Sequence, residues 1–219
     1  VKDIELLKKE DPQWVHKTNS YASPTPILEA GKLYCQNGSY GTACLDTQSG
    51  KVLWTNQDQW VMHENGPGSS PILWNDLLIF HMDGSDRQFI AALDKRTGDE
   101  LWRVNRDEPT TWATPFIVEH GDVTQVITAG TNRVRSYDLA TGEMIWDGPG
   151  LTLNTVPSPV YADGVVYLTA GYRGNALMAV DLDKAAGDID GTDAIVWRIE
   201  RDTPYVPSPL LIDDVLYYV

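Results

Sequence analysis

Residues 92–102 read Ala-Leu-Asp-Lys-Arg-Thr-Gly-Asp-Glu-Leu-Trp, and this stretch decides the fold because it recurs along the chain. The same order of aspartate, Thr/Ser-Gly and tryptophan occurs at residues 44–54 and 136–146. A fourth copy starts at residue 179 and reaches its tryptophan after an insertion. Recurrence at a fixed period indicates a repeat architecture. The signature positions are Asp46, Gly50, Trp54, Asp94, Gly98, Trp102, Asp138, Gly142, Trp146, Asp181 and Trp197.

A proline opens each repeat. These prolines are 45, 44, 44 and 50 residues apart, at Pro26, Pro71, Pro115, Pro159 and Pro209. Short runs of β-branched and aromatic residues follow, such as 77–80 and 165–168, and turn residues interrupt them every 8 to 12 positions. This spacing is typical of short strands, and the sequence shows no sustained helical stripe. The sequence therefore predicts an all-β propeller with four-stranded antiparallel blades.

The predicted domain is a partial β-propeller over residues 1–219. We expect four full blades at residues 23–58, 68–106, 112–150 and 157–200, with partial blades at 1–22 and 208–219. We read 1–22 as the last strand of an earlier blade and its exit loop. Known rings of this type have about seven or eight blades, and rings of four blades are rare. The ring is therefore expected to be incomplete, and remaining blades of the same protein or a partner chain would complete it.

The signature residues have structural roles in this interpretation. The aspartate bonds turn amides, and the glycine supplies a positive φ. The tryptophan, placed once per blade, is large enough to pack between neighbouring blades. Function is then expected in the loops of the opposite rim.

The stretch at residues 92–102 resembles the tryptophan-docking motif of quinoprotein-type (PQQ-like) propeller repeats. Four signature copies and five proline starts extend the resemblance over nearly the whole chain. This family includes quinone-dependent alcohol dehydrogenases, a propeller lipoprotein of outer-membrane protein assembly, and exported bacterial repeat proteins of unassigned function. The stretches 19–26, 66–71 and 204–211 look most like the last group. The resemblance implies a periplasmic or extracellular location in the bacterial envelope.

The resemblance extends to the repeat but not to the residues that bind the cofactor. The dehydrogenases of the family place two adjacent cysteines over the quinone, and Cys35 and Cys44 are not adjacent. They also hold a calcium or lanthanide ion inside a complete ring. We therefore expect no cofactor and no metal. PQQ with calcium belongs only to the alternative that the chain is part of a quinone-dependent alcohol dehydrogenase.

The charge balance limits the partners. With 17 basic and 31 acidic side chains the formal net charge is −14, which argues against nucleic acid and anionic membrane surfaces. It fits a site for cations or neutral ligands, or plain solubility. No apolar run approaches the roughly 18 residues of a membrane helix, so the chain is not expected to span a membrane.

Ligand-binding candidates come from the loops on one rim of the predicted blades. His63 beside Glu64 is either a base or metal half-site or a polar rim. The aromatic residues either stack on sugars or other flat ligands or anchor loops. The candidates are Trp60, His63, Glu64, Asn65, Trp112, Asn154, Tyr172, Arg173 and Tyr205.

Two further features are left open. Cys35 and Cys44 flank a predicted hairpin, and a symmetric turn places them opposite each other, as a disulfide or as two small buried thiols. Residues 183–193 form an acidic insertion, read as a solvated loop rather than a calcium site, because its glycine does not match a calcium loop.

The sequence contains no recognisable catalytic constellation. We therefore expect a non-catalytic binding or scaffold module of an exported bacterial protein, with a protein or carbohydrate partner on the loop rim. The alternatives are part of a quinoprotein dehydrogenase, which is an enzyme, and a scaffold for outer-membrane assembly.

Overall fold

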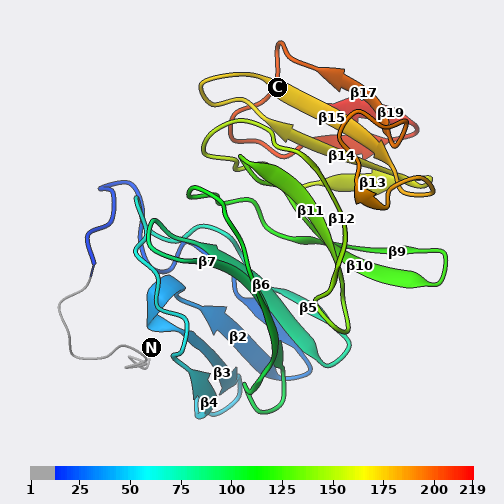
Figure 1. The fold of residues 1–219 in the computed structure, drawn as a ribbon. Helices are drawn as coiled ribbons and strands as arrows, with labels where there is room; N and C mark the ends of the chain where they lie inside the picture. Colours follow the sequence, from blue (N-terminus) through cyan, green and yellow to red (C-terminus); the bar gives the residue numbers. More distant parts are fainter. Residues whose placement is uncertain (1–12) are drawn as a thin grey trace. The chain divides into compact units, whose positions relative to one another are not determined.

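The computed structural model describes residues 13–219 and consists of two compact units, one up to Arg106 and one from Asp107 onward. The fold is all-β, as predicted. Figure 1 shows the strands as arrows grouped into separate sheets. Among the described residues the only helical element is a single 3-10 turn, η1 (Gly38–Tyr40).

The first unit contains two four-stranded antiparallel sheets, each with its strands in sequence order. The first sheet consists of β1 (Ile27–Glu29), β2 (Lys32–Gln36), β3 (Thr42–Asp46) and β4 (Val52–Asn56). The second consists of β5 (Ile72–Trp74), β6 (Leu77–Asp83), β7 (Gln88–Asp94) and β8 (Glu100–Asn105). Each sheet is thus a meander of short strands, the form expected of one blade.

The second unit contains two further meanders and a hairpin. One sheet has β9 (Phe116–His120), β10 (Val123–Thr128), β11 (Arg133–Asp138), β12 (Met144–Pro149) and, beyond β12, β16 (Gly187–Asp188). The next has β13 (Val160–Ala162), β14 (Val165–Ala170), β15 (Ala176–Asp181) and β17 (Ile195–Ile199). The hairpin pairs β18 (Leu210–Ile212) with β19 (Val215–Tyr217).

Two kinds of turn connect these strands. Tight two-residue turns join the first and second strands, and their first residues have positive φ, as at Asn75 (48°) and Asp163 (49°). Asn and Asp tolerate this conformation, so the hairpins close where the sequence places them. The signature forms the later turn, where Asp138 Oδ1 accepts hydrogen bonds from the amides of Ala140 and Thr141 at 3.0 and 2.8 Å.

All four meanders share a register shift directly before this signature turn. The shift lies between Cys44 and Leu45 in the first sheet, and between Ala92 and Leu93 in the second. The third and fourth sheets shift at Ser136/Tyr137 and Ala179/Val180. A bulge bends a strand and increases its twist. The repeat therefore specifies the same distortion in every blade.

Each unit has its own hydrophobic core between its sheets. In the first, Leu78, Phe80 and Leu93 pack with Tyr34. In the second, Val134 and Trp146 pack with Leu168 and Met178. Side chains of this size stabilise a fold by roughly 1.5–3 kcal/mol each when fully buried.

The insertion at residues 183–193 corrects the expectation of a solvated loop. Its strand β16 pairs in parallel with β12, placing Gly187 beside Trp146 and Asp188 beside Asp147. Ile189 is buried in the core of the second unit. Arg133 donates to Asp147 Oδ2 at 2.6 Å and to Asp188 Oδ1 at 2.7 Å. The acidic residues remain exposed, but the insertion covers the edge strand of the preceding sheet.

Part of the predicted blade 1–22 falls on residues 1–12, which lie outside the described residues. Residues 13–22 contain turns and no strand. Within residues 13–219, no helix has the length and hydrophobicity needed to cross a bilayer.

Candidate functional site

Three of the predicted ligand residues meet in the second unit. The rings of Tyr172 and Tyr205 stack with centroids 4.9 Å apart and an interplanar angle of 25°. The Arg173 guanidinium lies 5.3 Å from the centroid of the Tyr172 ring. Stacked rings and a cation over an aromatic face are both favourable contacts. We call these three residues the tyrosine site.

Hydrogen bonds fix the two loops that carry these side chains. Thr203, two residues before Tyr205, donates through its amide to Asn175 Oδ1 at 3.1 Å. Its hydroxyl donates to the carbonyl of Ala170 at 2.8 Å, at the end of β14. The loop at residues 171–175 is therefore joined to the loop at residues 200–206.

The same loops approach each other too closely for a side chain at Gly171. A Cβ atom at this position would lie 2.5 Å from the Thr203 carbonyl oxygen. A third loop joins the pair, because Leu153 forms an isolated antiparallel bridge with Tyr172. Sequence reasoning missed Leu153, Thr203 and Asn175 as supports, since such contacts join residues remote in sequence.

The tyrosine site is exposed although its backbone is fixed. Tyr205 retains 42% of its accessible surface, and the neighbouring Leu153 and Val206 retain 40% and 55%. Tyrosine and arginine are the residue types most enriched at the centres of protein interfaces. Rigid aromatic side chains also lose little entropy on binding. The arrangement is therefore suited to binding a partner surface.

Two other candidates in the second unit lie in the loops near this site. Asn154 adopts a positive φ of 54°, next to the bridging residue Leu153. The Trp112 backbone amide donates to the Thr155 carbonyl at 2.8 Å, so this hydrogen bond connects Trp112 to the loop at residues 150–155.

Four candidates lie in the first unit, where a second aromatic cluster forms. Trp60 contacts Tyr40 edge-to-face at 5.9 Å, and Tyr40 contacts Tyr21 in the same way at 4.7 Å. The Gln13 amide donates to the Tyr40 hydroxyl at 2.6 Å, and Gln13 accepts a hydrogen bond from Tyr21. Tyr40 is only 5% exposed. We call Tyr21, Tyr40 and Trp60 the inner aromatic cluster.

His63, Glu64 and Asn65 differ in their environments. His63 is largely buried, and this burial lowers its pKa to about 4, against the opposing influence of Asp86 and Asp83. Its amide donates to Gln13 Oε1 at 3.2 Å. Glu64 is exposed, and the Asn65 carbonyl accepts the Asn19 side-chain amide at 2.9 Å. His63 Nε2 is buried without a hydrogen-bond partner among the described residues, whereas the Glu64 side chain is exposed.

The expectation that Cys35 and Cys44 lie directly opposite each other is wrong. Cys35 lies opposite Ala43, and Cys44 lies opposite Tyr34. Because side chains alternate between the faces of a strand, this one-residue offset sends the two thiols to opposite faces of the sheet. Both cysteines are free. Burial raises the pKa of each thiol, which does not favour reactivity.

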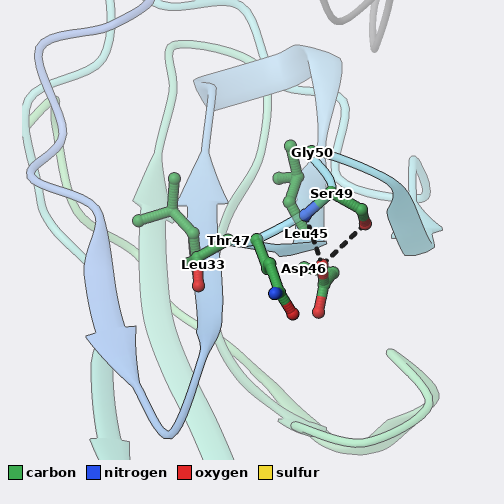
Figure 2. Close-up of a pocket in the computed structure, with 7 residues that line it drawn as sticks. Leu33, Leu45, Asp46, Thr47, Ser49 and Gly50 are labelled. Atoms are coloured by element: carbon green, nitrogen blue, oxygen red, sulfur yellow. Dashed lines mark hydrogen bonds between the residues drawn. The ribbon is translucent and has the colours of Figure 1, made fainter.

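A hollow of about 370 Å³ opens at the signature turn of the first sheet and is lined by Leu33, Leu45 and residues 46–50. Figure 2 shows Asp46 at its edge, accepting hydrogen bonds from the Ser49 amide and hydroxyl at 2.7 and 2.6 Å. These bonds lower the pKa of Asp46. The lining residues belong to the repeated turn and bring no convergent polar groups besides the turn itself.

At the equivalent turn of the second sheet, the indole ring of Trp54 from the first sheet packs against the turn. Trp54 Nε1 donates to the Lys95 carbonyl at 3.0 Å, and a Cβ at Gly98 would lie 2.5 Å from the Trp54 ring. The glycine is thus required where the indole of one sheet packs on the turn of the next. This correspondence indicates that the hollow in Figure 2 is a packing surface of the repeat and not a ligand site.

Buried ion pairs lie beneath the loops of each unit. In the first, Arg106 Nε donates to Asp83 Oδ1 at 3.0 Å, and both side chains are fully buried. In the second, Arg135 Nη1 donates to Glu108 Oε1 at 2.5 Å. Paired buried charges of this kind fix loop geometry more reliably than they add stability. Across residues 13–219, no three or more His, Cys, Asp or Glu side chains gather around a possible metal position.

Comparisons with known proteins agree with the fold. The family model described as outer membrane protein assembly factor BamB matches residues 86–219. An outer membrane protein assembly factor BamB from Francisella salina is 29% identical over 107 residues, which is 48% of this chain and 18% of that protein. The crystal structure of BamB from Moraxella catarrhalis superposes with a TM-score of 0.60 and 16% identity, covering 92% of this chain and 55% of that one.

Dehydrogenase structures share the fold as well. A europium-containing methanol dehydrogenase gives a TM-score of 0.58 at 14% identity, covering 80% of this chain and 41% of that one. A quinohemoprotein alcohol dehydrogenase from Comamonas testosteroni gives 0.56 at 15% identity, covering 93% and 39%. At these identities the likeness shows the fold alone.

The chain spans about half of the Moraxella structure and less than a fifth of the Francisella relative. The predicted partial propeller of four-stranded blades is confirmed by these neighbours together with the four meanders. The family match extends over more than half of the chain, so the chain belongs to the outer membrane protein assembly factor BamB family of PQQ-like β-propellers.

Proposed function

We propose that this chain is a non-catalytic scaffold module of the bacterial envelope, which binds a protein partner through the loops around the tyrosine site. The observation that carries the proposal is the stacking of Tyr172 on the exposed Tyr205, with the Arg173 guanidinium over the Tyr172 ring. The family match supports an assembly role, because the matched family and the Francisella relative are described as outer membrane protein assembly factors. A periplasmic location is part of the same proposal.

The geometry supports a protein partner through preorganisation. Hydrogen bonds of Thr203 hold the two loops, and Gly171 allows their close approach. Binding to such a surface requires little ordering, which is the main cost that weakens exposed loop sites. An aromatic centre with a cation beside it then provides the contacts in which interface energy concentrates.

Site-specific photocrosslinking tests the proposal in the native cells. A photoreactive phenylalanine analogue replaces Tyr205 in one variant and Leu28 in another, because Leu28 lies on β1 in the first unit and is 69% exposed. We expect one discrete protein adduct from position 205 and none from position 28. No adduct at 205, or the same adduct from both positions, would contradict the proposed docking site.

The dehydrogenase alternative predicts a different measurement. The fit of the described residues to its cofactor is poor, since Cys35 and Cys44 lie on neighbouring strands with side chains on opposite faces. We predict that adding PQQ and calcium to the purified protein gives no saturable change in visible absorbance. A saturable change would favour the dehydrogenase alternative over the scaffold.

A further inference from the structure

The two loops of the tyrosine site carry as many basic as acidic residues, whereas the chain as a whole is strongly acidic. The chain has a formal net charge of −14. The loop at residues 171–175 contributes one charged residue, Arg173, and the loop at residues 200–206 contributes Arg201 beside Asp202 and Glu200. Glu200 already accepts a hydrogen bond from Arg198 at 3.1 Å. Arg173 is the charged residue that contacts the stacked rings through its guanidinium.

Arg173 has its donors available to a ligand. Its guanidinium lies over the Tyr172 ring, and no carboxylate among the described residues lies within ion-pair distance of it. A guanidinium carries five N–H donors in a planar fork. Such a fork binds a carboxylate in bidentate fashion, with hydrogen bonds stronger than those between neutral groups.

The side chains that adjoin Arg173 and Tyr172 are apolar and exposed. Tyr205 is 42% exposed and continues into Val206 and Leu153, which are exposed as well. A ligand that places a carboxylate on Arg173 therefore places its neighbouring group against these side chains. An aromatic ring or a proline ring suits this surface, because both are flat and lose little entropy on binding.

We infer that the tyrosine site recognises an acidic segment of a protein, in which Asp or Glu stands next to an aromatic residue or proline. This inference rests on the proposed function, because it specifies the partner chemistry of the same site. The carboxylate pairs with Arg173, and the neighbouring ring packs against Tyr205. The negative charge of the rest of the chain repels acidic segments elsewhere, so recognition is confined to this patch.

A peptide selection tests the inference. A displayed library of random seven-residue peptides is selected on the wild-type chain after depletion on the Tyr205→Ala variant. We expect recovered sequences to be enriched in Asp or Glu beside Phe, Tyr, Trp or Pro. Synthetic peptides from this pool are then compared with counterparts in which Asn and Gln replace Asp and Glu.

Arg173→Gln provides the matched control. It removes the cation and leaves both tyrosines in place. The acidic peptide should lose about tenfold or more in affinity on this variant, as expected for a charge-assisted pair, while its amide counterpart should bind both proteins equally.

The outcomes separate the inference from the proposed function. Enrichment of neutral or basic peptides that still requires Tyr205 overturns the acidic ligand but leaves the docking site intact. Selective retention of neutral oligosaccharides by the wild type, without peptides, overturns the protein partner itself. If neither peptides nor oligosaccharides distinguish the wild type from Tyr205→Ala, both the inference and the proposed site fail.

Discussion

The inner aromatic cluster of the first unit and the tyrosine site of the second use the same residue types for different ends. Tyr40 is 5% exposed and its hydroxyl accepts the Gln13 amide, whereas Tyr205 is 42% exposed and stacks on Tyr172 at the surface. The presence of an aromatic residue in a propeller loop therefore does not by itself indicate a functional site. Burial and hydrogen bonding separate an anchor from a docking surface.

Replacing Tyr40 with alanine should give the largest effect. The change removes a buried ring from between Tyr21 and Trp60 and leaves the Gln13 amide without its acceptor. Losses of this kind cost about 3–5 kcal/mol. We expect this decrease in the free energy of unfolding, measured by chemical denaturation. Tyr40→Phe keeps the ring and should lose less than half as much, and equal losses would show that packing is not the cause.

The second prediction concerns His63, whose backbone amide donates to Gln13, the residue that also donates to Tyr40. Its folded pKa of about 4 lies below the ordinary value of 6.5, so the folded state binds fewer protons than the unfolded state. The stabilisation is complete above pH 6.5 and is lost as the pH falls through 4. The unfolding free energy should drop by about 3 kcal/mol across this window.

His63→Gln removes the titrating group and serves as the control for that pH dependence. We expect its stability curve between pH 6.5 and 4 to be flatter than that of the wild type. Parallel curves for the two proteins would show that His63 does not titrate in a buried environment.

The third prediction concerns a hydrogen bond that holds the two loops of the tyrosine site together. Asn175→Ala removes the acceptor of the Thr203 amide, whereas the Thr203 hydroxyl keeps its acceptor at the Ala170 carbonyl. We expect a loss of about 1 kcal/mol in stability, because the lost hydrogen bond is partly exposed. Hydrogen exchange of the loop at residues 200–206 should accelerate at the same time. Unchanged exchange would mean that other contacts fix this loop.

The smallest stability effect should come from the docking surface itself. Tyr205→Ala removes a stacking contact worth about 0.5–1.5 kcal/mol from a ring that is already half exposed. We expect a melting temperature close to that of the wild type. Tyr205→Phe should be indistinguishable from the wild type in stability. A loss of stability as large as that of Tyr40→Ala would show that Tyr205 anchors the fold as Tyr40 does, and would contradict the distinction between the two clusters.

The sequence was sufficient for the repeated parts of the fold. Aspartate, glycine and tryptophan at fixed spacing specify a local turn, and local turns are readable because their partners are near in sequence. The register of the hairpin between β2 and β3 was not readable: its connection at residues 37–41 places Gln36 opposite Thr42, and for this reason Cys35 and Cys44 do not face each other. A one-residue change in register reverses the face of every side chain.

The same limit explains why neither the pairing of the insertion nor the tyrosine site was predicted from the sequence. Trp146 and Gly187 are paired although they are far apart in the sequence, and the repeat pattern gives no sign of this pairing. The insertion was therefore predicted to be a solvated loop. Tyr172, Arg173 and Tyr205 were among the nine candidates, but the sequence could not show that these three side chains meet. The Thr203 and Asn175 contacts that decide this depend on three-dimensional proximity.

The most direct test is the affinity of the purified protein for the partner captured by crosslinking at position 205. The dissociation constant is measured for the wild type and for Tyr205→Ala, with circular dichroism and the melting temperature recorded for both proteins. If the tyrosine site is the docking centre, the variant should keep its fold and lose about 30-fold in affinity, as expected for a central interface residue. An unchanged affinity in a folded variant would contradict the account.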